Sequence, residues 1–116
     1  MRVLISLLLC STLAACSTGE PAPPVVYVPP SMPTTEAVTR GIKQAATDAH
    51  LIGAIEMSDL RPTDHGLGHF MLCIRGVSRD SRTGTYAVFF DNNEYKGLRL
   101  PVILDACEKQ DYRPVP

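Results

Sequence analysis

Residues 69–77 read His-Phe-Met-Leu-Cys-Ile-Arg-Gly-Val, and this stretch decides the fold that the sequence predicts. Its five consecutive apolar residues leave no polar face, which is typical of a strand buried on both sides in the centre of a sheet. Residues 85–91, which contain Tyr-Ala-Val-Phe-Phe, have the same character. Turn-forming residues fill the short link at 78–84, so we expect the two strands to be antiparallel neighbours.

Two further strands are predicted on either side of this pair. Residues 54–60 alternate Ile55 and Met57 with polar residues, which is the pattern of a half-buried strand. Residues 98–104 place a leucine or valine at every second position. Pro101 cannot donate to a strand ladder, so we expect this last strand at an edge or at a bulge.

A helix is predicted before the first strand, from Thr34 or Thr35 to about His50. Either threonine can cap the first turn, which also carries Glu36. Apolar residues recur at helical spacing, namely Val38, Ile42, Ala45 and Ala49. The sequence therefore predicts an α+β domain at residues 34–116, with one N-terminal helix packed on a small, roughly four-stranded antiparallel sheet.

The start of the chain has the three-part layout of a secretory signal. Arg2 supplies a positive charge, residues 3–9 are almost unbroken aliphatic sequence, and small residues follow. The apolar run is too short to span a bilayer comfortably. Residues 13–16, Leu-Ala-Ala-Cys, resemble the lipobox of bacterial lipoproteins, and this resemblance covers only the first sixteen residues.

The resemblance implies that residues 1–15 are removed, that the sulfur of Cys16 receives a diacylglyceryl group, and that the new amino group is acylated. Such an anchor is durable, because each buried methylene contributes about 0.8 kcal/mol. In this family an aspartate after the cysteine tends to hold the protein in the inner membrane, whereas this chain has Ser17. We therefore expect the outer membrane, on its periplasmic face. The alternative is an ordinary signal peptide with a chance cysteine.

The cysteines of the mature chain are predicted to form one disulfide. Cys10 leaves with the signal and Cys16 carries the lipid, so Cys73 and Cys107 remain. In the oxidising periplasm their pairing would stabilise a small domain by roughly 3 to 4 kcal/mol in the chain-entropy model. The alternative is two free buried thiols.

Residues 16–33 form a tether between the lipid and the domain. Proline occupies six positions in this stretch, which favours an extended polyproline conformation with a reach of roughly 50 Å. The simplest interpretation is a semi-rigid spacer. The alternative is that residues 25–28, Val-Val-Tyr-Val, dock on a partner or on the domain's own sheet edge.

Two groups of residues are weak candidates for a binding site. His65 and His69 lie four apart beside Asp64, but two intervening glycines argue against a helix. In a strand the two rings would lie about 13 Å apart, too far to share a zinc ion. We therefore expect a solvated loop and no metal. The most basic neighbourhood contains Arg75, Arg79 and Arg82, which we expect to solvate the end of a hairpin. The alternative is that they contact an anionic partner.

Charge and motifs favour an interaction protein. Without Arg2 the chain has ten basic and 12 acidic residues, and this small net negative charge does not favour nucleic acid as a partner. No nucleophile, phosphate-binding or cofactor motif is present. We expect a lipid-anchored, non-enzymatic interaction or accessory module of an outer-membrane or periplasmic assembly, with an envelope protein as partner. The alternative is a small periplasmic ligand- or metal-binding sensor or inhibitor that uses the His65–His69 loop.

Overall fold

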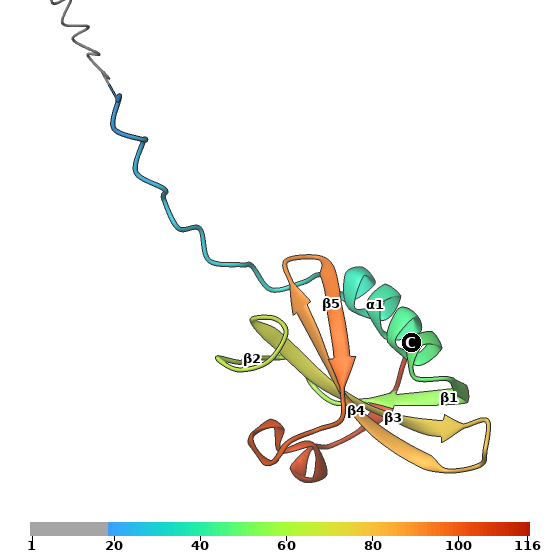
Figure 1. Ribbon diagram of the computed structural model, residues 1–116. Helices are drawn as coiled ribbons and strands as arrows, with labels where there is room; N and C mark the ends of the chain where they lie inside the picture. Colours follow the sequence, from blue (N-terminus) through green and yellow to red (C-terminus); the bar gives the residue numbers. More distant parts are fainter. Residues whose placement is uncertain (1–18) are drawn as a thin grey trace, which may run out of the picture.

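The computed structural model describes residues 19–116, in which one helix packs against an antiparallel sheet of six strands (Figure 1). The elements are α1 (Thr35–Asp48), β1 (Leu51–Met57), β2 (Arg61–Pro62), β3 (Phe70–Ser78), β4 (Thr83–Asp91), β5 (Glu94–Arg99), two 3₁₀ helices, η1 (Ile103–Asp105) and η2 (Cys107–Lys109), and β6 (Arg113–Pro114). The predicted α+β class is confirmed, with two short strands more than the four expected. The predicted signal and Cys16 lie outside the described residues.

The central pair of strands is where the sequence placed it. β3 and β4 pair in antiparallel register from Phe70 opposite Phe90 to Val77 opposite Thr83. The sheet order is β5-β4-β3-β1-β6, so the four longest strands form a meander, and β2 also pairs with β3. Within residues 19–116, no helix is long and apolar enough to cross a membrane.

The helix α1 covers one face of the sheet. Thr34 caps it by accepting a hydrogen bond of 3.2 Å from the Ala37 N–H, as expected. Val38, Ile42 and Ala45 form a core with side chains of the sheet, namely Met57, Leu72, Ile74, Val88 and Phe90. Gly41 is required at its position, because an added Cβ would lie 2.3 Å from the Phe90 ring.

The opposite face carries a second, smaller core, which is covered by the segment that contains η1 and η2 and not by an α-helix. It contains Met71, Cys73, Ala87, Phe89 and Cys107. The predicted disulfide joins Cys73 in β3 to Cys107 in η2 and is confirmed, with a Cα–Cα distance of 5.7 Å. The segment between β5 and β6 is thereby held against this face of the sheet.

The predicted bounds of the two outer strands are wrong. β1 begins at Leu51 and contains a bulge, because the register passes from Ile52 opposite Val77 to Glu56 opposite Arg75. β5 ends at Arg99, and the residues after it leave the sheet. The alternation at 98–104 therefore does not come from a strand: Pro101 lies outside the ladder, and η1 follows it.

Candidate interaction surface

The chain exposes a run of aliphatic side chains directly after β5. Leu100 is 71% exposed, Val102 48%, Ile103 89% and Leu104 71%. We call residues 100–104, which also include Pro101, the apolar loop. Single exposed aliphatic residues are normal, but a contiguous exposed group of this kind is typical of a binding surface.

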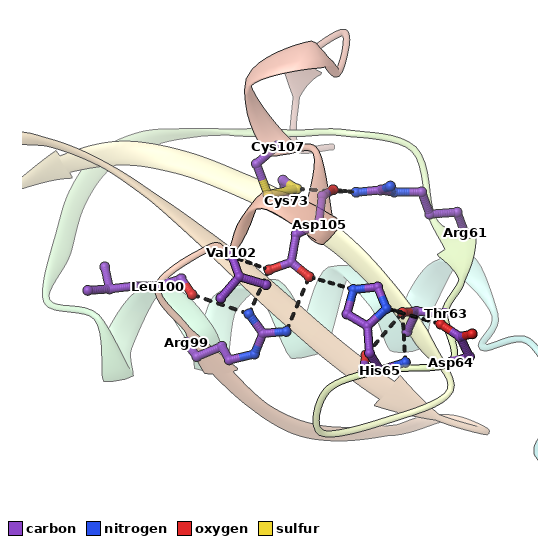
Figure 2. A network of polar contacts seen from close by, with 10 residues as sticks. All are labelled: Arg61, Thr63, Asp64, His65, Cys73, Arg99, Leu100, Val102, Asp105 and Cys107. Carbon is purple, nitrogen blue, oxygen red and sulfur yellow. Dashed lines mark hydrogen bonds and ion pairs between the residues drawn. A yellow bond between two sulfur atoms is a disulfide. The ribbon is translucent and has the colours of Figure 1, made fainter.

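The buried carboxylate of Asp105 contacts the backbone of the apolar loop and the side chain of Arg99, the residue before it (Figure 2). Asp105 is completely buried, with an exposed fraction of 0%. Arg99 donates to both of its oxygens, over 2.6 Å to Oδ2 and 3.2 Å to Oδ1. The Val102 N–H donates to Oδ2 over 2.8 Å. The Asp105 carboxylate therefore holds Arg99, directly before the loop, and Val102, in the middle of the loop. Asp105 itself directly follows the loop.

Two more contacts hold the same carboxylate and its backbone. The His65 Nε2 lies 3.0 Å from Asp105 Oδ1, and Arg61 donates a hydrogen bond to the Asp105 carbonyl oxygen. Ala106 follows in the left-handed region with φ 51°, and Cys107 forms the disulfide. The backbone after the apolar loop is thus fixed at three consecutive residues. We call Asp105, Arg99, His65 and Arg61 the Asp105 cluster.

Within the Asp105 cluster, the charges of Asp105 and Arg99 compensate each other. Burial by itself would raise the pKa of Asp105, but hydrogen bonds from Arg99, Val102 and His65 outweigh burial and hold this pKa below its usual range. The Arg99 guanidinium also lies over the Phe89 ring, 4.9 Å from its centroid. Asp105 is therefore an ionised carboxylate inside the protein, and Arg99 is its counter-ion.

The surroundings of His65 favour a structural role over a catalytic one. Its Nδ1 lies 3.1 Å from Thr63 Oγ1 and 3.1 Å from Asp64 Oδ1. A hydroxyl, an imidazole and a carboxylate in this order are the components of a nucleophilic triad. However, the Thr63 hydroxyl donates to the His65 carbonyl oxygen over 3.0 Å and accepts from the His65 N–H, so its proton closes a local turn.

The two histidines do not share a site. The His69 Nδ1 lies 2.8 Å from Asp91 Oδ1, whereas the ring of His65 faces Asp64 and Asp105. Burial by itself would raise the pKa of Asp91, but its hydrogen bonds with His69 outweigh burial and lower it. Within residues 19–116 there is no group of three or more His, Cys, Asp or Glu side chains that could hold a metal ion.

The three arginines of the basic neighbourhood lie in different environments. Arg75 in β3 pairs with Glu56 and lies over the Tyr112 ring, 4.1 Å from its centroid. Arg82 pairs with Asp80 at 3.6 Å, and Arg79 is exposed in the turn between β3 and β4. Arg75 is therefore part of the structure of the second face, and contact of these arginines with a partner stays a prediction.

The residues that build this surface are not recognisable from the sequence. A single aspartate before Ala-Cys carries no signal of burial, and the residues that contact it come from three separate segments. The alternation in Leu-Pro-Val-Ile-Leu predicts a strand, but in the structure these residues form the apolar loop and the start of η1. Pro101 was the signal that the ladder ends there.

No family model, no curated protein and no solved structure matches this chain. Its function must therefore be inferred from its own residues.

Proposed function

We propose that this protein is a lipid-anchored lipoprotein on the periplasmic face of the bacterial outer membrane, and that its domain is a non-enzymatic interaction module. Residues 13–16 and the proline-rich stretch support the anchor and the tether. One observation carries the proposal for the domain. Four exposed aliphatic side chains lie on a backbone that the Asp105 cluster and the disulfide fix in place.

A fixed backbone under exposed apolar side chains is the arrangement that favours binding. Removing such side chains from water on contact with a partner stabilises the complex, by roughly 25 cal/mol per Å² of apolar surface. Ordering a flexible loop would offset this gain, but this backbone is already ordered. The Asp105 carboxylate and the Arg99 guanidinium are engaged with each other, and within residues 19–116 Arg61 Nε is buried without a hydrogen-bond partner. The exposed contact surface therefore consists of the aliphatic side chains. The proposed partner is an envelope protein.

The first test compares crosslinked complexes recovered from intact envelopes. The natural chain is compared with Cys16→Ala, which lacks the anchor, and with Leu100→Ser combined with Ile103→Ser, which removes apolar surface from the loop. We expect one envelope protein with the natural chain and at least tenfold less of it with the loop variant, because central apolar contacts typically contribute more than about 1.4 kcal/mol. Loss with Cys16→Ala shows that the anchor is needed.

Matched controls separate binding from folding and from localisation. Lys43→Ser changes an exposed residue of α1 and should recover the partner like the natural chain. The mass of the mature N-terminus reports whether Cys16 carries lipid. Equal recovery with the loop variant would reject the apolar loop as the contact surface, and an unmodified Cys16 would reject the anchor.

A further inference from the structure

The root of the tether is fixed to one end of the domain. The Ser31 N–H and hydroxyl donate to Asn92 Oδ1 over 2.8 Å and 3.0 Å, and the Thr34 N–H donates to Asn93 Oδ1 over 2.9 Å. Both asparagines lie in the turn between β4 and β5. We call these four residues the tether clamp. It gives the tether a defined direction where it leaves the domain.

The tether clamp and the apolar loop lie at opposite ends of β5 (Figure 1). β5 begins at Glu94, directly after Asn93, and ends at Arg99, directly before the loop. Its six residues separate the two ends by about 20 Å. Residues 19–30 are extended and lead away from the domain, which at about 3.1 Å per residue spans roughly 35 Å.

We infer that the tether clamp directs the apolar loop away from the membrane that carries Cys16, so that its occupant is a periplasmic protein with an uncharged aliphatic groove and not the anchoring bilayer. This inference rests on the proposed function and adds the direction and the chemistry of the partner. In this arrangement the loop lies up to roughly 55 Å beyond the start of the described tether, which is the sum of the two lengths.

The charges around the loop support a protein groove over a bilayer. A surface that docks on anionic lipid gains from an excess of lysine and arginine at its rim. The apolar loop has no charge of its own, and the two residues that flank it, Arg99 and Asp105, neutralise each other. η2 adds Glu108 and Lys109, which are again one of each sign. Arg61 and Asp64, which line a hollow together with Leu104, are also one of each sign. The rim of the loop therefore has no excess of positive charge, and the complementary surface is apolar.

A single tryptophan tests whether the loop touches the bilayer. The natural sequence has no tryptophan, so Ile103→Trp reports on this position alone. The lipidated full chain is placed in vesicles of phosphatidylethanolamine and phosphatidylglycerol, with plain or brominated acyl chains. We expect equal emission in both. Gly19→Trp, near the anchor, should be quenched by brominated lipid and shows that the chain is inserted. Quenching of Ile103→Trp would overturn the inference.

The tether clamp is tested in the same vesicles. Asn92→Gly removes one acceptor while suiting the φ of 51° at this position, and Asn93→Ala removes the other. With both changes the domain should be free to rotate relative to the tether. The apolar loop can then reach the bilayer, so the emission of Ile103→Trp should be quenched in brominated vesicles. Unchanged emission would show that the clamp does not orient the loop.

The direction of the partner is tested by a photocrosslinker at position 103 in living cells. We expect an adduct with another protein, loss of the adduct when residues 20–28 are deleted, and its return when a Gly/Ser stretch of equal length replaces them. An adduct with lipid or with a second copy, recognised by mass, or one that survives the deletion, would overturn the placement of the partner. Absence of an adduct from every form would instead reject the proposed function.

Discussion

At the scale of the residue, Asp105 has the largest influence on the proposed contact surface. It is fully buried, and its carboxylate reaches the residue before the apolar loop, the middle of the loop and His65. A buried charge is tolerated only when its partners are in place, and removing one partner leaves the other uncompensated. Asp105 therefore determines whether the loop has one conformation.

We predict that Asp105→Asn lowers the free energy of unfolding by about 2 to 4 kcal/mol, because it leaves Arg99 without its counter-ion. Urea denaturation measures this change. Asp64→Asn is the matched control, since Asp64 contacts the same imidazole but is fully exposed, and it should leave stability nearly unchanged. Equal effects of the two variants would contradict a special role for the buried carboxylate.

The loss of stability at low pH should also depend on Asp105. The folded state lowers the pKa of Asp105, so its contribution to stability is fully present above the unfolded-state pKa of about 3.9 and is lost as the pH falls through the folded-state value. Asp91 adds a contribution of the same sign. We expect the natural chain to lose stability below about pH 4 more steeply than Asp105→Asn. Parallel acid limbs would show that Asp105 does not titrate as proposed.

At the scale of the element, the junction of η1 and η2 is strained. Ala106 adopts φ 51°, a left-handed conformation that disfavours any residue with a Cβ. The flanking contacts of Asp105 and Cys107 hold it there. Backbone strain that persists between fixed neighbours is consistent with a segment held in one shape for function.

Ala106→Gly should relieve this strain and raise the free energy of unfolding by up to about 1 kcal/mol, after the entropy cost of glycine is subtracted. Thermal unfolding measures the change. Ala46→Gly, in the last turn of α1, should instead lower stability, by up to about 1 kcal/mol. Destabilisation by Ala106→Gly as well would mean that the left-handed conformation is not maintained in solution.

The disulfide is the second element-scale support of the apolar loop. Reduction of the natural chain should cost about 3 to 4 kcal/mol, because the bridge joins residues separated by 34 positions. Amide exchange should increase more in η1 and η2 than in β3 and β4, because only the former lose their attachment to the sheet. A variant with Cys73→Ala and Cys107→Ala should not respond to the reductant. Uniform exchange across the domain would contradict this localised effect.

At the scale of the whole molecule, the two faces of the sheet are covered by different segments. One face is covered by α1 and holds the larger core, while the other holds the disulfide and the Asp105 cluster beneath the apolar loop. The tether leaves from the end of β5 that lies opposite the loop. The proposed anchor, the folded domain and the proposed contact surface therefore occupy different parts of the chain.

Because of this separation, deletion of residues 20–28 should change the free energy of unfolding of the domain by less than about 0.5 kcal/mol. These residues are all exposed, and the tether clamp begins only at Ser31. Chemical denaturation of the deleted and natural chains measures the difference. A larger loss of stability would indicate that Val25–Val28 packs on the domain, which was the alternative interpretation of these residues.

Local sequence patterns were sufficient to predict the elements whose residues show a clear periodicity or an unbroken apolar run. The double-sided apolar runs gave β3 and β4 because such residues must be buried on both faces of a sheet. Threonine before a run at helical spacing gave α1 and its cap. The disulfide was predicted from the expectation that only Cys73 and Cys107 remain in the mature chain, and the structure confirms the pair.

The sequence by itself thus determined the α+β class, the central hairpin, the helix and the Cys73–Cys107 bridge, because each depends on periodicity or counting. Only the tertiary structure decided that Asp105 is buried, that His65 and His69 bind different carboxylates, and that residues 100–104 form an exposed loop instead of a strand. The physical reason is that burial of a charge depends on partners brought from distant segments. Arg61, His65 and Arg99 reach Asp105 only after the sheet has formed.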